Sequence, residues 1–170
     1  ETNFFGLVAV TKAVLPSMRA RRSGKVVNIS SISGRIGFPS MGPYVASKFA
    51  VEGFSESLRL EMLPYGVHVV LIEPGSYKTE IWSKGLDAVS VNPDSPYVKE
   101  MEKILKYVNH VADTAPSPYE VIQQIVHVAK SPYPKLRYPV GKGVKLGIVL
   151  KNILPWKWWE RMVMKRLWES

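Results

Sequence analysis

The sequence predicts an α/β fold with a parallel sheet. Two short runs rich in β-branched residues, 25–30 and 67–72, have the composition of strands that are covered on both faces. Between them, residues 43–63 carry an apolar stripe at helical spacing. Because the order strand, helix, strand is typical of a right-handed crossover, we expect the two strands to pair in parallel.

Proline and glycine set the expected limits of the first helices. Residues 4–20 form an amphipathic pattern whose last turn should be irregular at Pro16. The helix over 43–63 begins with Pro43, which suits a first helical position, and it ends before Pro64.

Further helices are predicted beyond residue 75, where the pattern first loosens. One helix opens at Ser95 and Pro96, and a capping box over 117–120 opens another. A weaker strand is expected near 137–140. No run of 18 apolar residues is free of charge, so we do not expect a membrane-spanning helix.

The composition is that of a globular domain, and the positive charge is concentrated in the tail. The chain has 170 residues, of which 46% are hydrophobic and 22% charged, and it has no cysteine, which excludes disulfides and thiolate chemistry. Of the net charge of +9, residues 135–170 contribute +7 through nine Lys or Arg and two Glu. No nucleic-acid-binding fold accompanies this charge, so we expect no nucleic-acid partner.

Tyr44 and Lys48 are the strongest candidates for chemistry. They lie four residues apart at the start of a predicted helix, so their side chains share one face. An ammonium near a phenol favours the phenolate, and we expect the pKa of Tyr44 to fall from about 10 toward neutrality. Such a tyrosine can act as a general acid or base. Ser31 follows the first strand, and we expect it to hold a carbonyl oxygen against Tyr44.

A Tyr-Lys pair at this spacing is common by chance, and its neighbours make the catalytic interpretation stronger. The residues beside it are small and leave room for a ligand: Gly42, Ala46 and Ser47. The three histidines, at 68, 110 and 127, lack metal-ligand spacing, so no metal site is expected. A hydrolase triad is disfavoured because the chain has no Gly-x-Ser-x-Gly elbow.

Four motifs follow one another at a characteristic spacing. They are Asn3 in Asn-Phe-Phe-Gly, Asn28-Ile-Ser-Ser31 with Gly34, Tyr44-Val-Ala-Ser-Lys48, and Pro74-Gly75 followed by Thr79. In these motifs the chain resembles the C-terminal part of the short-chain dehydrogenase/reductase (SDR) family, strongly over 1–80 and loosely over 118–141. The resemblance implies a Rossmann-like doubly wound parallel sheet, of which only the C-terminal half, about three strands and their helices, is present. Residues 1–143 would be the catalytic part, with 80–117 as the substrate lid and 144–170 as a basic, Trp-rich extension.

The resemblance also implies a role for each motif. Tyr44 would transfer the proton while NAD or NADP transfers hydride. Tyr44 and Lys48 would both contact the cofactor, Lys48 at the nicotinamide ribose. Ser31 would orient the substrate oxygen. Asn3 would hold a water that relays protons from Lys48 and would support an irregular turn in its helix. The nicotinamide would be met by Pro74, Gly75 and Thr79.

Several parts of the family's pattern would precede Glu1, so we interpret the chain as a fragment. These parts are the glycine-rich phosphate-binding turn, the residue that selects NAD or NADP, and an Asn-Asn-Ala-Gly segment. We therefore expect the 170 residues alone to bind dinucleotide weakly and to be inactive. Tyr77 departs from the family, which often has a small branched residue at this place. In the fragment, the strand edge and helix faces that the missing half would cover favour dimerisation or aggregation. The intact protein is expected to be a homo-oligomer.

The substrate class and the tail leave alternatives open. Glu73-Pro-Gly with Lys78-Thr79 is similar to the steroid and retinol branch, which implies a lipophilic alcohol or carbonyl substrate. The tail interleaves four tryptophans with basic residues, and a helical stripe would contain Trp156, Trp159, Val163 and Leu167. The tail either contacts a membrane surface or lipid substrate, or packs at a subunit interface or against the missing half of the domain. We expect a cytoplasmic enzyme with membrane association through the tail; the alternative is a catalytically silent module that uses this tail for binding.

Overall fold

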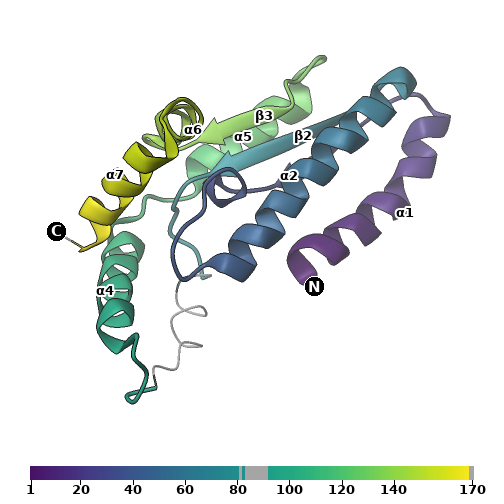
Figure 1. The fold of residues 1–170 in the computed structure, drawn as a ribbon. Helices are drawn as coiled ribbons and strands as arrows, with labels where there is room; N and C mark the ends of the chain where they lie inside the picture. Colours follow the sequence, from purple (N-terminus) through teal and green to yellow (C-terminus); the bar gives the residue numbers. More distant parts are fainter. Residues whose placement is uncertain (81, 83–91, 169–170) are drawn as a thin grey trace. The chain divides into compact units, whose positions relative to one another are not determined.

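The computed structural model describes residues 1–80, 82 and 92–168, with side chains up to residue 165. The chain divides into two compact units (Figure 1). The first unit contains residues 1–75 and 119–148, and the second contains 76–118 and 149–170. Residues 149–170 of the tail thus fall in the same unit as most of the segment expected to be the lid.

The first unit is built on a parallel three-stranded sheet. Its strands are β1 (Gly24–Ile29), β2 (Val67–Pro74) and β3 (Arg137–Val140), in the order β1-β2-β3. Gly24 to Ile29 pair in register with Val67 to Ile72, and Leu71 to Pro74 pair with Arg137 to Val140. All three predicted strands are confirmed, and so is the parallel pairing.

The central strand β2 forms the core of this unit. Val67 and the run Val69–Ile72 are fully buried, because β2 has a strand on each side and helices on both faces. In the described sheet β1 lies at an edge, and its Ile29 is 42% exposed. The expectation that both strands would be covered on both faces therefore holds for β2 and only in part for β1.

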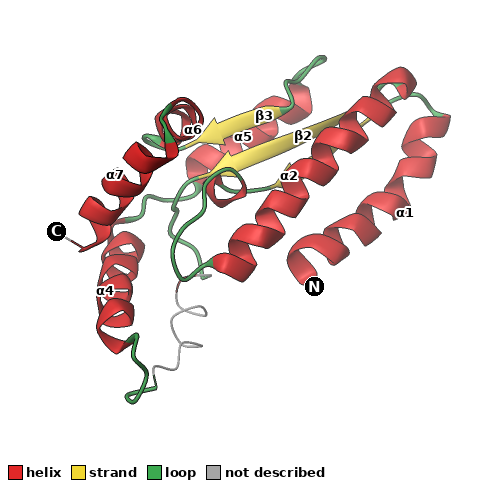
Figure 2. Ribbon diagram, viewed as in Figure 1, coloured by secondary structure: helices red, strands yellow, loops and turns green. Residues whose placement is uncertain are grey.

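Helices of the first unit lie on both faces of the sheet. A π-helical turn, η1 (Thr2–Gly6), leads into α1 (Leu7–Ala20), and α2 (Gly42–Met62) continues into the short η3 (Leu63–Tyr65). Figure 2 shows α2 in front of the strands and α5 (Tyr119–Lys130) behind them. Leu58 of α2 packs with Val26 of β1 and Val69 of β2 in one apolar cluster.

The second unit is helical in its described part. It contains α4 (Val98–Thr114), α7 (Trp156–Trp168) and the end of α6 (Val144–Ile153), and α4 packs against α7. Pro155 stands between α6 and α7, where its ring prevents one continuous helix. Among the described residues, no helix combines the length and apolar character that crossing a membrane requires.

An added methyl group should change the free energy of unfolding in opposite directions at two glycines, Gly66 and Gly53. Gly66 has a φ of +68°, and a Cβ there would lie 2.4 Å from the Arg22 carbonyl oxygen. Gly53 lies inside α2 with nothing within 4 Å of its added Cβ. We expect Gly66→Ala to lower the free energy of unfolding by about 2 kcal/mol. Gly53→Ala should raise it by roughly 0.5–1 kcal/mol. Urea unfolding measures both, and equal effects would contradict the assigned backbone geometry.

Candidate active site

Two polar turns follow the carboxyl ends of β1 and β2, where parallel α/β sheets bind their ligands. The turn after β1 begins at Ser31, which caps the one-turn helix η2 (Ile32–Gly34). Its Oγ accepts a hydrogen bond from the Ser33 amide at 3.1 Å, and its carbonyl accepts one from Gly34 at 2.9 Å. Because Oγ is an acceptor in this contact, the Ser31 hydroxyl can still donate a hydrogen bond.

The same turn packs directly on α2, and this contact requires glycine at position 34. A Cβ at Gly34 would lie 2.7 Å from Ser30 Oγ, 2.9 Å from Glu52 Cγ and 3.0 Å from the Lys48 carbonyl oxygen. Two of these neighbours belong to α2. The helix that carries Lys48 is therefore in close contact with the turn that carries Ser31.

Lys48 connects α2 to the end of β1. Its ammonium donates a hydrogen bond to the Ile29 carbonyl at 3.0 Å, two residues before Ser31. The same nitrogen lies 5.7 Å from the centroid of the Tyr44 ring, within the range of a cation–π contact. Burial lowers the pKa of Lys48 below its ordinary value, because a charged ammonium loses hydration there. The structure thus brings Tyr44 and Lys48 together on one helix face, as their spacing predicts.

Asn3 reaches the same helix from η1. Its Nδ2 donates to Ser47 Oγ at 3.3 Å, and the Ser47 hydroxyl donates to the Tyr44 carbonyl at 2.7 Å. Asn3 lies within the π-helical turn over residues 2–6, at the place where the resemblance implies an irregular helix. Sequence reasoning treated Ser47 only as a small residue, whereas here it connects Asn3 to the backbone of Tyr44.

The remaining predicted residues fall in both units. Pro74 ends β2, and the Gly75 amide donates to the Val140 carbonyl at 2.9 Å. A Cβ at Gly75 would lie 2.8 Å from Val144 Cγ2, so no side chain fits there without a shift. Thr79 belongs to the second unit and is exposed.

Tyr77, the departure from the family pattern, also lies in the second unit. Its side chain is buried, and its carbonyl accepts a hydrogen bond from Trp82 Nε1 at 2.8 Å. These contacts tie Tyr77 to the segment that was expected to form the lid.

A cluster of charged side chains behind the turn was not expected from the sequence. Glu73 is fully buried, and its Oε1 accepts a hydrogen bond from Arg35 at 3.0 Å. Arg137 bonds Glu52 at 2.9 Å, lies 3.5 Å from Glu73 and also pairs with Glu56. A signal was available, since Glu73 follows the apolar run Val69–Ile72 within β2 and a buried carboxylate needs a partner. The partners themselves come from distant segments and could not be inferred.

The lowered pKa of Lys48 should make the free energy of unfolding depend on pH. Its pKa is lowered in the folded state, so the unfolded chain binds the proton more tightly as pH rises toward about 10.5. The cost of burying the ammonium is present at neutral pH, begins to fall as pH rises through the lowered folded pKa, and is gone near 10.5, the ordinary pKa of the side chain. We therefore expect wild type to gain stability relative to Lys48→Met as pH rises from neutral toward 10.5. Urea unfolding at several pH values measures this difference, and a constant or opposite trend would contradict the assignment.

The chain is similar to proteins that are named as oxidoreductases. It is 49% identical over 170 residues to the uncharacterised oxidoreductase YusZ of Bacillus subtilis, covering 98% of this chain and 61% of that protein. It is 39% identical over 149 residues to human retinol dehydrogenase 8, covering 81% of this chain and 46% of the relative. The chain thus spans about half to three fifths of the length of these relatives.

Solved structures share the fold. A short-chain dehydrogenase from Burkholderia cenocepacia, crystallised with NADP, superposes with a TM-score of 0.68 at 20% identity, covering 98% of this chain and 56% of that one. The family model described as short chain dehydrogenase matches residues 1–89, a span that holds Asn3, Ser31, Tyr44 and Lys48. The chain therefore belongs to the short-chain dehydrogenase family.

Proposed function

We propose that the intact protein is an NAD(P)-dependent oxidoreductase that interconverts an alcohol and a ketone or aldehyde. The arrangement of Tyr44 and Lys48 carries this proposal. The lysine lies beside the phenol and is held on the last carbonyl of β1, close to the turn of Ser31. A proton donor, a cation and a hydroxyl thereby stand at the carboxyl end of the sheet, where ligands bind.

Each residue has a distinct task in this reaction. Tyr44 gives a proton to the carbonyl oxygen during reduction and takes it back during oxidation. The Lys48 ammonium lies 5.7 Å from the centroid of the Tyr44 ring and holds the ribose of the cofactor beside it. Ser31 donates its hydroxyl hydrogen to the substrate oxygen and holds it against Tyr44. Asn3 supports the helix start and holds a water that relays protons from Lys48.

The donor set at this site fits a nicotinamide cofactor. Lys48 uses one of its three N–H bonds on Ile29, which leaves two that can bind the ribose hydroxyls. The cofactor, NAD or NADP, supplies the hydride. Pro74, Gly75 and Thr79 would bind the nicotinamide, and the NADP bound by the Burkholderia enzyme supports this class of cofactor.

We also propose a lipophilic substrate and a homo-oligomer. The relative named retinol dehydrogenase 8 supports an apolar alcohol or carbonyl compound as the substrate. Apolar side chains on α1 and α2 are open to solvent and suit a subunit interface; they are Val10, Phe49 and Leu60.

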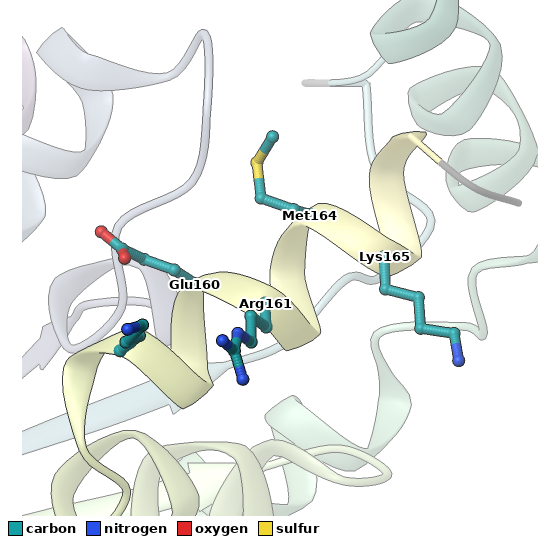
Figure 3. Close-up of a pocket in the computed structure, with 5 residues that line it drawn as sticks. Glu160, Arg161, Met164 and Lys165 are labelled. Carbon is teal, nitrogen blue, oxygen red and sulfur yellow. The ribbon is translucent and has the colours of Figure 1, made fainter.

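A second function, peripheral contact with an anionic membrane, is favoured by α7. Trp158 is 61% exposed and Met162 42%, and they lie one turn apart. Next to them a basic row of helical spacing contains Lys157, Arg161 and Lys165. The row lines an open hollow of about 510 Å³, and Figure 3 shows Arg161 and Lys165 extending from the helix.

This face differs from the stripe that the sequence predicted. Trp159 is only 8% exposed and Val163 is half-buried, so these two members of the stripe point inward. Trp156 is exposed, with Lys151 Nζ 5.0 Å from its ring centroid. The side chain of Leu167 lies outside the described residues. Aromatic and basic side chains that share an exposed surface are typical of contact with anionic lipid headgroups.

Replacing the catalytic phenol tests the proposed reaction. In the intact protein, Tyr44→Phe should lower kcat by a factor on the order of 10³, because only the transferable proton is removed. Cofactor affinity should stay within about twofold. Tyr65→Phe, in η3 beside Arg19, is the matched control and should keep full activity. Steady-state kinetics and cofactor titration measure both, and a Tyr44→Phe enzyme that keeps most of its activity would refute the mechanism.

Cosedimentation with vesicles tests the membrane contact. The chain should bind vesicles that contain phosphatidylserine, and bind those of pure phosphatidylcholine far less. Because each basic side chain contributes about 1 kcal/mol, Lys157→Gln with Arg161→Gln should weaken binding by about tenfold or more. A double change on α4, Lys99→Gln with Lys106→Gln, removes the same charge elsewhere and should have a smaller effect. Equal losses in both variants would indicate nonspecific attraction and contradict a docking face.

A further inference from the structure

Five charged side chains meet between the turn after β1, helix α2 and strands β2 and β3. They are Arg35, Glu52, Glu56, Glu73 and Arg137. Glu73 is fully buried and Glu52 is 4% exposed, whereas the Glu56 side chain is 55% exposed. The cluster therefore has a buried centre, formed by Glu73 and Glu52, and a solvent-facing rim.

The cluster as a whole holds more carboxyl groups than guanidinium groups. Three carboxyl groups face two guanidinium groups, and within the described part of the chain Glu52 Oε1 and Glu73 Oε2 are buried without a hydrogen-bond partner. Burial, with the nearby Glu52 carboxylate, raises the pKa of Glu73, and Arg35 and Arg137 oppose this effect. A buried ionic cluster of this kind is costly and is weak evidence for stability alone. The cluster lies at the carboxyl end of β2, next to the candidate active site, which suggests that it contributes to the function of that site.

Arg35 is the link between this cluster and the turn of Ser31. It is the first residue after η2, and its amide donates to the Ile32 carbonyl at 3.0 Å. Its guanidinium then bonds Glu73, the residue before Pro74. The turn is thus held at Gly34 by close packing on α2 and immediately afterwards by a charged bond to β2.

We propose that Arg35 is a positioning residue, which through its bond to buried Glu73 fixes the orientation of the turn that presents Ser31 to the substrate oxygen. This inference rests on the proposed function. Arg35 itself does not need to touch substrate or cofactor. Arg137 pairs with both Glu73 and Glu52 and so connects β2 to α2. Together the two arginines keep the turn, α2 and the sheet in a fixed relative orientation.

The Arg35 side chain is suited to a test because it is 26% exposed and therefore only partly buried. Arg59 provides a matched control at the other end of α2. Its guanidinium donates to the carbonyls of Val69 and Pro134, far along the strand from the turn. Arg59→Met therefore removes a comparable half-buried anchor that has no connection with Ser31.

A double-mutant cycle in the intact enzyme measures the coupling. Arg35→Met should lower kcat by about tenfold and leave cofactor affinity and the pH profile of kcat/KM unchanged, because Tyr44 and Lys48 keep their contacts. In a Ser31→Ala background, Arg35→Met should lower kcat by less than about twofold. Arg35→Lys should restore most of the activity, since an ammonium can still pair with Glu73. Arg59→Met should lower stability and leave kcat unchanged.

Hydrogen exchange provides a readout that does not need activity. In the 170-residue chain, Arg35→Met should speed exchange of the Gly34 and Ile36 amides, which bond the Ser31 and Ile32 carbonyls, by about tenfold. The amides of β2 should be unaffected. Arg35→Gln serves as the second variant if Arg35→Met does not fold.

The outcomes separate this proposal from the proposed function. The positioning role would be overturned if the kcat losses of Arg35→Met and Ser31→Ala multiply in the double variant, or if Arg59→Met lowers kcat as much as Arg35→Met does. Unchanged hydrogen exchange at the Gly34 and Ile36 amides would also overturn it. If Tyr44→Phe keeps full activity, the proposed reaction fails, but faster exchange in Arg35→Met would still support the fixing of the turn.

Discussion

The hydrogen bond from Lys48 to the Ile29 carbonyl is the constraint on which the candidate site depends. A lysine side chain is long and flexible, and by itself its position one turn from Tyr44 would not fix its ammonium. The strand end supplies an acceptor at 3.0 Å, and this acceptor lies two residues before Ser31. One contact therefore orders the cation, sets its distance from the phenol and joins the helix to the serine turn.

The second constraint is close packing between that turn and α2. Gly34 leaves no room for a side chain, and the position after it carries the charged bond from Arg35 to Glu73. Apolar packing brings the segments together without direction, whereas a guanidinium–carboxylate bond has a preferred geometry. The buried cluster thus provides orientation at a place where hydrophobic burial alone would allow the turn to shift.

The tail shows how packing changes the meaning of a sequence pattern. The periodicity of α7 puts Trp159 and Val163 on one stripe, and it is this stripe that packs inward in the second unit. The exposed face is formed instead by Trp158 and Met162 beside basic residues. A tryptophan stripe alone therefore does not reveal which side of a helix meets a membrane or a partner.

The sequence by itself determined the three strands, their parallel order, the helices α1, α2, α4 and α5, and the Tyr44–Lys48 spacing, because these follow from local periodicity and from fixed spacing along one helix. Pro64 and Gly66 likewise marked the end of this helical segment, in which α2 ends at Met62 and Pro64 lies in η3. Only the tertiary structure decided the partners of Glu73, the link from Asn3 to Ser47 and the division into two units. The physical reason is the separation of the partners along the chain. A hydrogen bond or ion pair between residues 38 to 85 positions apart depends on how the elements pack, and no local sequence pattern predicts it.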